Sequence, residues 1–185
     1  AAKEINWLTG ENVNLGGVLF PHFHFNAAYG GSTIDQERLA VSHHDPQRDD
    51  WTVQGFEFGT SLRAGDYLEG FGTLLLLYNG NERVWEHEFE EWFGKVKNLP
   101  FGLELRGGQY LNRFGFQNSL HNHSWIFADQ YLTNGLLLGE DGLTTIGGEV
   151  TWKLPVTWTS LISVSVGLPR EEDEHHHDEP AVEPE

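Results

Sequence analysis

The sequence contains no cysteine and no methionine, and it has few basic residues, 11 Lys and Arg against 28 Asp and Glu. The lack of cysteine excludes disulfide scaffolds and metal sites built from thiolates. The formal net charge is −17, so nucleic acid is not an expected partner, because phosphate binding needs basic patches. No apolar run reaches the ~18 residues that a membrane helix needs. If the chain crosses a membrane, we expect a β-barrel, in which every backbone group is paired.

Sequence motifs of enzymes are also lacking. The chain has no Gly-x-Ser-x-Gly nucleophile elbow and no phosphate-binding loop. Adjacent carboxylates such as Glu90 and Glu91 point to opposite faces of a regular strand, so they predict no acid–base pair. We therefore expect a protein that is not an enzyme.

What the sequence does contain favours β structure, with 22 glycines and 13% aromatic residues. Seven segments alternate between two kinds of side chain, as strands with two different faces do. Most have about ten to twelve residues, the length of a tilted strand that crosses a bilayer, whereas strands of soluble proteins average ~5–6. The face assignment fails only for 67–78, which is apolar on both faces. The segments are 20–29, 51–63, 67–78, 84–93, 101–110, 143–154 and 156–167.

The connections between these segments alternate in length. The short ones are Ala64–Asp66, a link that ends with Asn98–Pro100, and Pro155, and the long ones cover about 30–50 and 111–142. The turn at 79–82 is of moderate length and fits the alternation least well. Outer-membrane barrels have short periplasmic turns and long outer loops. The pattern therefore places the N-terminus in the periplasm and the histidine-bearing loops outside.

These observations predict an all-β fold, an antiparallel transmembrane β-barrel in the bacterial outer membrane. We expect a periplasmic N-terminal segment at 1–15, barrel strands and loops at 16–169, and an acidic, histidine-rich outer loop or tail at 170–185. Seven strands are an odd number, whereas single-chain bacterial barrels have an even number. We therefore expect the N-terminal part of a larger barrel, or a barrel that closes with other copies of the chain.

The stretch 101–154 also carries a series of short motifs, and an acidic segment at 86–93 precedes it. The motifs are Phe-Gly at 114–115, His-x-His-x-Trp-x-Phe-x-Asp at 121–129 and a turn bounded by glycines at 139–142. This series resembles that of porin-like outer-membrane β-barrel proteins described as zinc-regulated TonB-dependent receptors. The resemblance covers roughly the central half of the chain and implies a barrel with more strands. The chain shows no TonB box or plug domain, so we expect no TonB-coupled import. The matching residues are Phe114, Gly115, His121, His123, Trp125, Phe127, Asp129, Gly139, Asp141 and Gly142.

Two histidines in the long loop could bind one metal ion. His121 and His123 are two residues apart, so in an extended segment both imidazoles point the same way. Asp129 could complete or orient such a site, because metal-bound histidines usually have a carboxylate partner. The alternative is a loop folded into the barrel mouth, with the histidines hydrogen-bonded to the backbone. His22 and His24 repeat the spacing and would face the lumen, where we interpret them as satisfied polar residues.

A second candidate metal site lies in the acidic tail. Three consecutive histidines stand among carboxylates, a composition typical of labile binding of Zn, Cu or Ni, although a solvated acidic segment has the same composition. The candidate ligands are His175, His176, His177 and Asp178.

The predicted lumen face is acidic, which favours cations over anions unless its bases simply pair with the acids. We therefore expect a barrel that passes or captures small cationic solutes, with divalent metals such as zinc the favoured class. Its other partners would be outer-membrane lipid, other membrane proteins or copies of itself. The alternatives are a structural barrel that anchors partner proteins at the cell surface and a secreted β-sandwich binding module. The acids are Glu57, Glu86, Glu88, Glu90, Glu104 and Glu149, and the bases are Arg63, Arg106 and Lys153.

Overall fold

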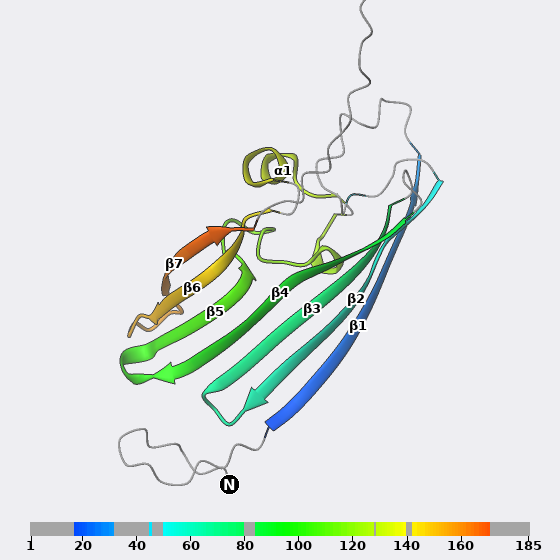
Figure 1. Cartoon of the computed structure of the whole chain (residues 1–185). Coiled ribbons are helices and arrows are strands. Elements are labelled where there is room, and N and C mark those ends of the chain that lie inside the picture. Colours follow the sequence, from blue (N-terminus) through cyan, green and yellow to red (C-terminus); the bar gives the residue numbers. More distant parts are fainter. Residues whose placement is uncertain are drawn as a thin grey trace, which may run out of the picture.

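A computed structural model describes residues 17–31, 45, 50–79, 84–127, 129–139 and 142–170. The described strands form one antiparallel sheet of seven strands in chain order. Figure 1 shows this sheet as a curved layer, with the long connection between β5 and β6 at one end of it. The strands are β1 (Gly17–Gly30), β2 (Asp50–Ala64), β3 (Leu68–Asn79), β4 (Val84–Leu99), β5 (Leu103–Leu111), β6 (Thr144–Lys153) and β7 (Leu161–Pro169).

The seven predicted strands and the all-β antiparallel class are confirmed. The closed transmembrane barrel stays a prediction, because the described strands form an open sheet with β1 and β7 at its edges. The strands have 9 to 16 residues, longer than the usual strand of a soluble protein. The predicted end segments at 1–15 and from 171 onward lie outside the described residues.

The last strand begins later than its alternating pattern suggests. The prediction of a strand from Val156 with Pro155 as the whole turn is wrong, because the connection covers 154–160. Pro155 has no N–H for the ladder, and the chain instead closes a loop in which the Leu154 N–H donates to the Ser160 carbonyl at 2.9 Å. Val156 and Trp158 therefore lie exposed in this loop.

The two faces of the sheet differ in chemistry. The inner face lies toward the β5–β6 connection, and the register places His24 beside Glu57, and Arg106 beside Glu149. The outer face exposes large apolar side chains along every strand. Among the described residues, the buried hydrophobic side chains are only Leu75, Leu77 and Tyr110, and buried polar ones outnumber them. The sheet is therefore polar where it is covered and apolar where it is exposed, the reverse of an ordinary soluble sheet.

A β-bulge in β4 changes which side chains face inward. Thr73 of β3 pairs with Glu91 and Leu74 pairs with Phe89, so Glu90 is an extra residue without a partner in the register. The alternation shifts by one at this point, and both Glu90 and Glu91 are buried on the inner face. The prediction that the two carboxylates point to opposite faces is therefore wrong.

The bulge has two further consequences. Phe93, predicted to share the face of Trp85 and Phe89, instead lies on the inner face, where its ring is 5.4 Å from that of Phe71. Gln109 of β5 fixes the bulge from the other side. Its amide nitrogen donates to the Phe89 carbonyl at 2.6 Å and to the Glu90 carbonyl at 3.2 Å. These bonds satisfy carbonyls that the regular ladder would otherwise pair.

The connection between β5 and β6 contains two short helical segments, η3 (Asn122–Ser124) and α1 (Leu132–Leu138). A third, η2 (Pro100–Gly102), joins β4 to β5 at the other end of the sheet. Two buried amides give the long connection its own polar core. Asn118 accepts from the Leu143 N–H at 2.7 Å, and Gln117 accepts from the Tyr131 N–H at 2.7 Å. None of the helices in the described part of the chain is long and apolar enough to cross a bilayer.

Candidate metal centre

Four imidazoles and three carboxylates gather on the inner face, near the end where the long connection lies. Adjacent register rows bring together strand residues that are far apart in the sequence. One row runs from His22 through Gly59 and Thr73 to Glu91, and the next contains His24 and Glu57. The connection between β5 and β6 adds two more histidines to this face. The group consists of His22, His24, Glu57, Glu90, Glu91, His121 and His123.

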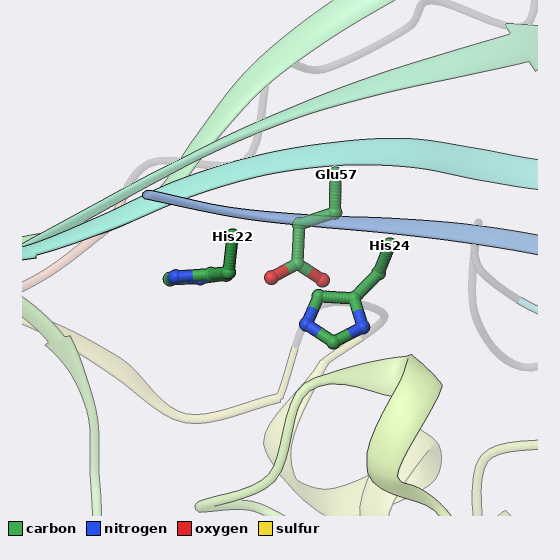
Figure 2. Close-up of side chains that lie close together, drawn as sticks. All are labelled: His22, His24 and Glu57. Carbon is green, nitrogen blue, oxygen red and sulfur yellow. The ribbon is translucent and has the colours of Figure 1, made fainter. Parts of the chain in front are cut away.

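The first half of this group lies on β1 and β2. The ligand atoms of His22, His24 and Glu57 all lie within 4.8 Å of one another. Figure 2 shows the Glu57 carboxylate between the two imidazole rings. Gly59, the register partner of His22, leaves room for this arrangement. A Cβ atom at Gly59 would lie 2.6 Å from His22 Cδ2 and closer still to Nε2 and Cε1.

The second half joins the long connection to β4. His121 Nδ1 donates to Glu90 Oε2 at 2.9 Å, and His121 Nε2 donates to Glu91 Oε2 at 2.7 Å. Glu91 also accepts the Leu111 N–H at 2.8 Å, so one carboxylate binds both the last residue of β5 and a histidine of the connection. Only a doubly protonated imidazole donates from both nitrogens. His121 therefore acts as a cation between two anions.

The charge of His121 follows from a competition between burial and hydrogen bonding. Its side chain is only 10% exposed, and this burial by itself lowers the pKa. The hydrogen bonds to Glu90 and Glu91, together with the attraction of their charges, outweigh the burial and raise the pKa of His121 to about 10. The imidazole is thus a stable imidazolium at neutral pH.

His123 connects the two halves. Its Nδ1 donates to Glu57 Oε2 at 2.6 Å, and its ring stacks on that of His24 with centroids 3.8 Å apart. Burial, followed by the positive charge of His121, lowers the pKa of His123. His123 is therefore a neutral donor to Glu57, in contrast to His121.

Glu57 is the carboxylate that both halves share. Its side chain is almost fully buried, and Oε1 has no hydrogen-bond partner. The nearest ionic neighbour of that atom is His121 Nδ1 at 3.7 Å, too far for a hydrogen bond. A buried carboxylate oxygen without a partner costs free energy, and a cation beside it would remove that cost.

The structure brings together only some of the predicted ligands. His121 and His123 do lie on the inner face, but they hydrogen-bond carboxylates rather than the backbone. Asp129 is in the same connection, yet it belongs to neither of the described groups that could hold a metal, and its carbonyl accepts from Gln117. His175, His176, His177 and Asp178 lie outside the described residues.

The sequence placed Glu57 and Glu90 on the predicted lumen face, but it singled out none of the three glutamates as a metal ligand and left His22 and His24 as satisfied polar residues. The i, i+2 spacing of His22 and His24 was a usable signal, because it repeats that of His121 and His123. The pairing of Glu90 with Glu91 was hidden by the bulge, which leaves no mark in the sequence. Glu57 could be linked to His24 only through the register between β1 and β2.

Most other charges of the inner face are paired, as the alternative in the sequence analysis allowed. Arg106 donates to Glu149 at 2.9 Å, and both side chains are buried. Lys95 lies 2.6 Å from Glu104. Lys97 pairs with Glu69, and Arg170 pairs with Glu88. The metal-ligand cluster is therefore distinct from the rest of this face, because it combines several carboxylates with imidazoles.

Comparison with known proteins adds no relative to this description. No family model matches the chain, and no curated protein and no solved structure matches it significantly. The resemblance to porin-like receptors therefore stays a prediction, and the site is defined by its own chemistry.

Proposed function

We propose that this protein is part of a non-enzymatic outer-membrane β-barrel that captures divalent metal cations on its lumenal face. The observation that carries the proposal is the convergence of imidazoles and carboxylates on the inner face, opposite an apolar outer face. Imidazole with carboxylate is a donor set suited to zinc and neighbouring transition metals. The sequence has no cysteine, so imidazole and carboxylate are the principal metal ligands that the chain offers.

The outer face supports lipid as a partner. Its middle carries exposed aliphatic and aromatic side chains, among them Phe89, Val150 and Val164. At the end near the long connection, the rings of Tyr29 and Trp51 lie 5.2 Å apart, as do those of Tyr78 and Trp85. Barrels in membranes place an apolar band between girdles of aromatic residues at the two interfaces.

A barrel in lipid also needs both edges of the sheet to be paired, because unpaired backbone groups are costly there. The proposal therefore includes additional strands against β1 and β7, supplied by further strands of the barrel or by other copies. A β-sandwich would instead need a second sheet on the apolar face, and the described strands form one sheet only.

The position of the β5–β6 connection favours capture over free passage. Its η3 segment contacts β1, and its two histidines occupy the inner face. A connection seated in the lumen is also what a structural barrel would have. A barrel that anchors partner proteins at the cell surface is therefore the second candidate function.

A single substitution on the outer face tests the membrane part of the proposal. Val150→Arg should destabilise the chain by about 2–4 kcal/mol in phospholipid vesicles, because a charged side chain on the lipid face is costly at mid-depth. The matched control is Val156→Arg, which changes a valine of similar exposure in the β6–β7 loop. Equal stabilities for both variants in vesicles, or a chain that stays soluble without detergent, would contradict the membrane assignment.

Zinc titration by calorimetry tests the metal part. The full chain in detergent should bind zinc, and a variant lacking residues 171–185 should still bind it at the inner face. A chain that binds no zinc would remove metal capture and leave the structural barrel. Single-channel recording separates the two modes of cation handling, since a plugged lumen should show no steady conductance.

A further inference from the structure

We propose that the metal ion is held at an open site of three protein ligands, His22, His24 and Glu57, with His123 as the residue that positions the carboxylate. The inference rests on the proposed function and makes it more specific. Of the seven side chains in the cluster, it assigns three as the metal ligands. The expected ligand is one divalent cation of the zinc class, completed by exchangeable water.

The strand geometry makes these three residues a chelating set. His22 and His24 are alternate residues of β1, so both point to the inner face. Glu57 is the register partner of His24, and the glycine opposite His22 allows that ring to lean over β2. No backbone movement is needed to bring the donor atoms within 4.8 Å of one another.

The alternative group of Glu57, Glu90 and His121 meets the same distance criterion. Both nitrogens of His121, however, are already hydrogen-bonded to carboxylates, so a metal could bind this ring only after one of these bonds is broken. In the first group, the Glu57 carboxylate lies between two imidazole rings, and its Oε1 atom has no hydrogen-bond partner (Figure 2). The cation therefore fits the β1–β2 group, and His121 fills the cation position of the other.

The hydrogen-bonding of the cluster supports one divalent ion rather than two. His121 already lies between Glu90 and Glu91 and is hydrogen-bonded to both, whereas the buried Oε1 of Glu57 has no hydrogen-bond partner. One divalent cation beside Glu57 fits this arrangement, and a second ion would bring further uncompensated charge into a buried site, which is unfavourable.

The number of ligands also has a functional meaning. Structural zinc sites are closed by four protein ligands, whereas sites with three keep a position open for water or substrate. An open site exchanges its ion more readily, as a protein that captures and passes on cations requires. The site is thus suited to transfer rather than to permanent stabilisation of the fold.

His123 acts on this site through Glu57. Its hydrogen bond to Oε2 fixes the orientation of the carboxylate between the imidazoles of His22 and His24, and its ring supports His24 by stacking. Such hydrogen bonds to metal ligands typically change metal affinity by about 10- to 100-fold. Because His123 belongs to the β5–β6 connection, metal affinity depends on that connection being seated.

The test compares zinc affinity across variants of the full chain in detergent. His24→Gln and Glu57→Gln should each weaken zinc binding by more than about 100-fold, since each removes a ligand. The matched control is His87→Gln, an exposed histidine on the outer face of β4, which should bind as the wild type does. His123→Leu should weaken binding about 10- to 100-fold, and His123→Asn, which keeps a donor at the Nδ1 position, should restore most of it.

X-ray absorption of the zinc-loaded wild type gives a measurement that needs no variant. The proposed site predicts two imidazole ligands and a stoichiometry of one, whereas the group with His121 predicts a single imidazole. One imidazole, or full affinity in both His24→Gln and Glu57→Gln, would overturn the assignment while metal capture itself stands. Absence of any zinc binding by the wild type would overturn the proposed metal function as well.

Discussion

Replacement of Gly59 by alanine should weaken metal binding although Gly59 offers no ligand. Gly59 lies in the middle of β2, opposite His22, and an added methyl group would occupy the space of the His22 ring. The atoms that it would meet belong to a side chain that can rotate, not to the backbone. The sheet should therefore tolerate the change, and the imidazole should move instead.

The size of the effect follows from the distances. The new Cβ would lie 2.6 Å from His22 Cδ2, and ordinary contacts begin at 3.4 Å, so the ring must retreat by at least 0.8 Å. Ligand distances in metal sites are defined to about 0.2 Å, so a shift of this size removes His22 from the coordination shell. We expect zinc affinity to fall at least about 10- to 100-fold, or roughly 1.4–2.7 kcal/mol.

Calorimetric zinc titration provides the assay, with the β-sheet signal of circular dichroism as the check on folding. Gly72→Ala is the matched control, because Gly72 is also a strand glycine and its added Cβ would meet nothing within 4 Å. Both variants should unfold at nearly the same denaturant concentration as the wild type. If Gly59→Ala binds zinc as tightly as Gly72→Ala does, His22 is not a ligand and the reasoning fails.

Three further predictions concern the surroundings of the site. In the metal-free chain, the pKa of His121 of about 10 lies above the usual 6.5, so its pairing with Glu90 and Glu91 stabilises the seated connection fully below pH 6.5. That contribution is lost as the pH rises through 10. The protection of residues 117–125 against hydrogen exchange should therefore fall around pH 10, and constant protection would contradict the prediction. Gln109→Leu should destabilise the chain by about 1–3 kcal/mol in denaturant unfolding, because two carbonyls of the bulge lose their donor. An unchanged free energy of unfolding would show that these hydrogen bonds do not stabilise the bulge. Arg106→Leu should cost about 3–5 kcal/mol by leaving Glu149 charged and buried, and adding Glu149→Leu should recover much of it; additive losses would refute the coupling.

The sequence by itself determined the all-β class, the seven strands and the polarity of most faces. Alternation with period two directly reports which side chains share a face, so β1 and β6 were assigned correctly. The long connection was also correctly identified as the carrier of His121 and His123. These features are local, and local spacing is what a sequence displays.

The tertiary structure alone decided where the candidate site lies. The bulge between Phe89 and Glu91 turned two adjacent carboxylates to one face, although regular alternation separates them. The register of β1 against β2 placed Glu57 beside His24, and a glycine opposite His22 gave its ring room. Each of these depends on how distant segments pair, and pairing is set by the whole sheet rather than by any local pattern of residues.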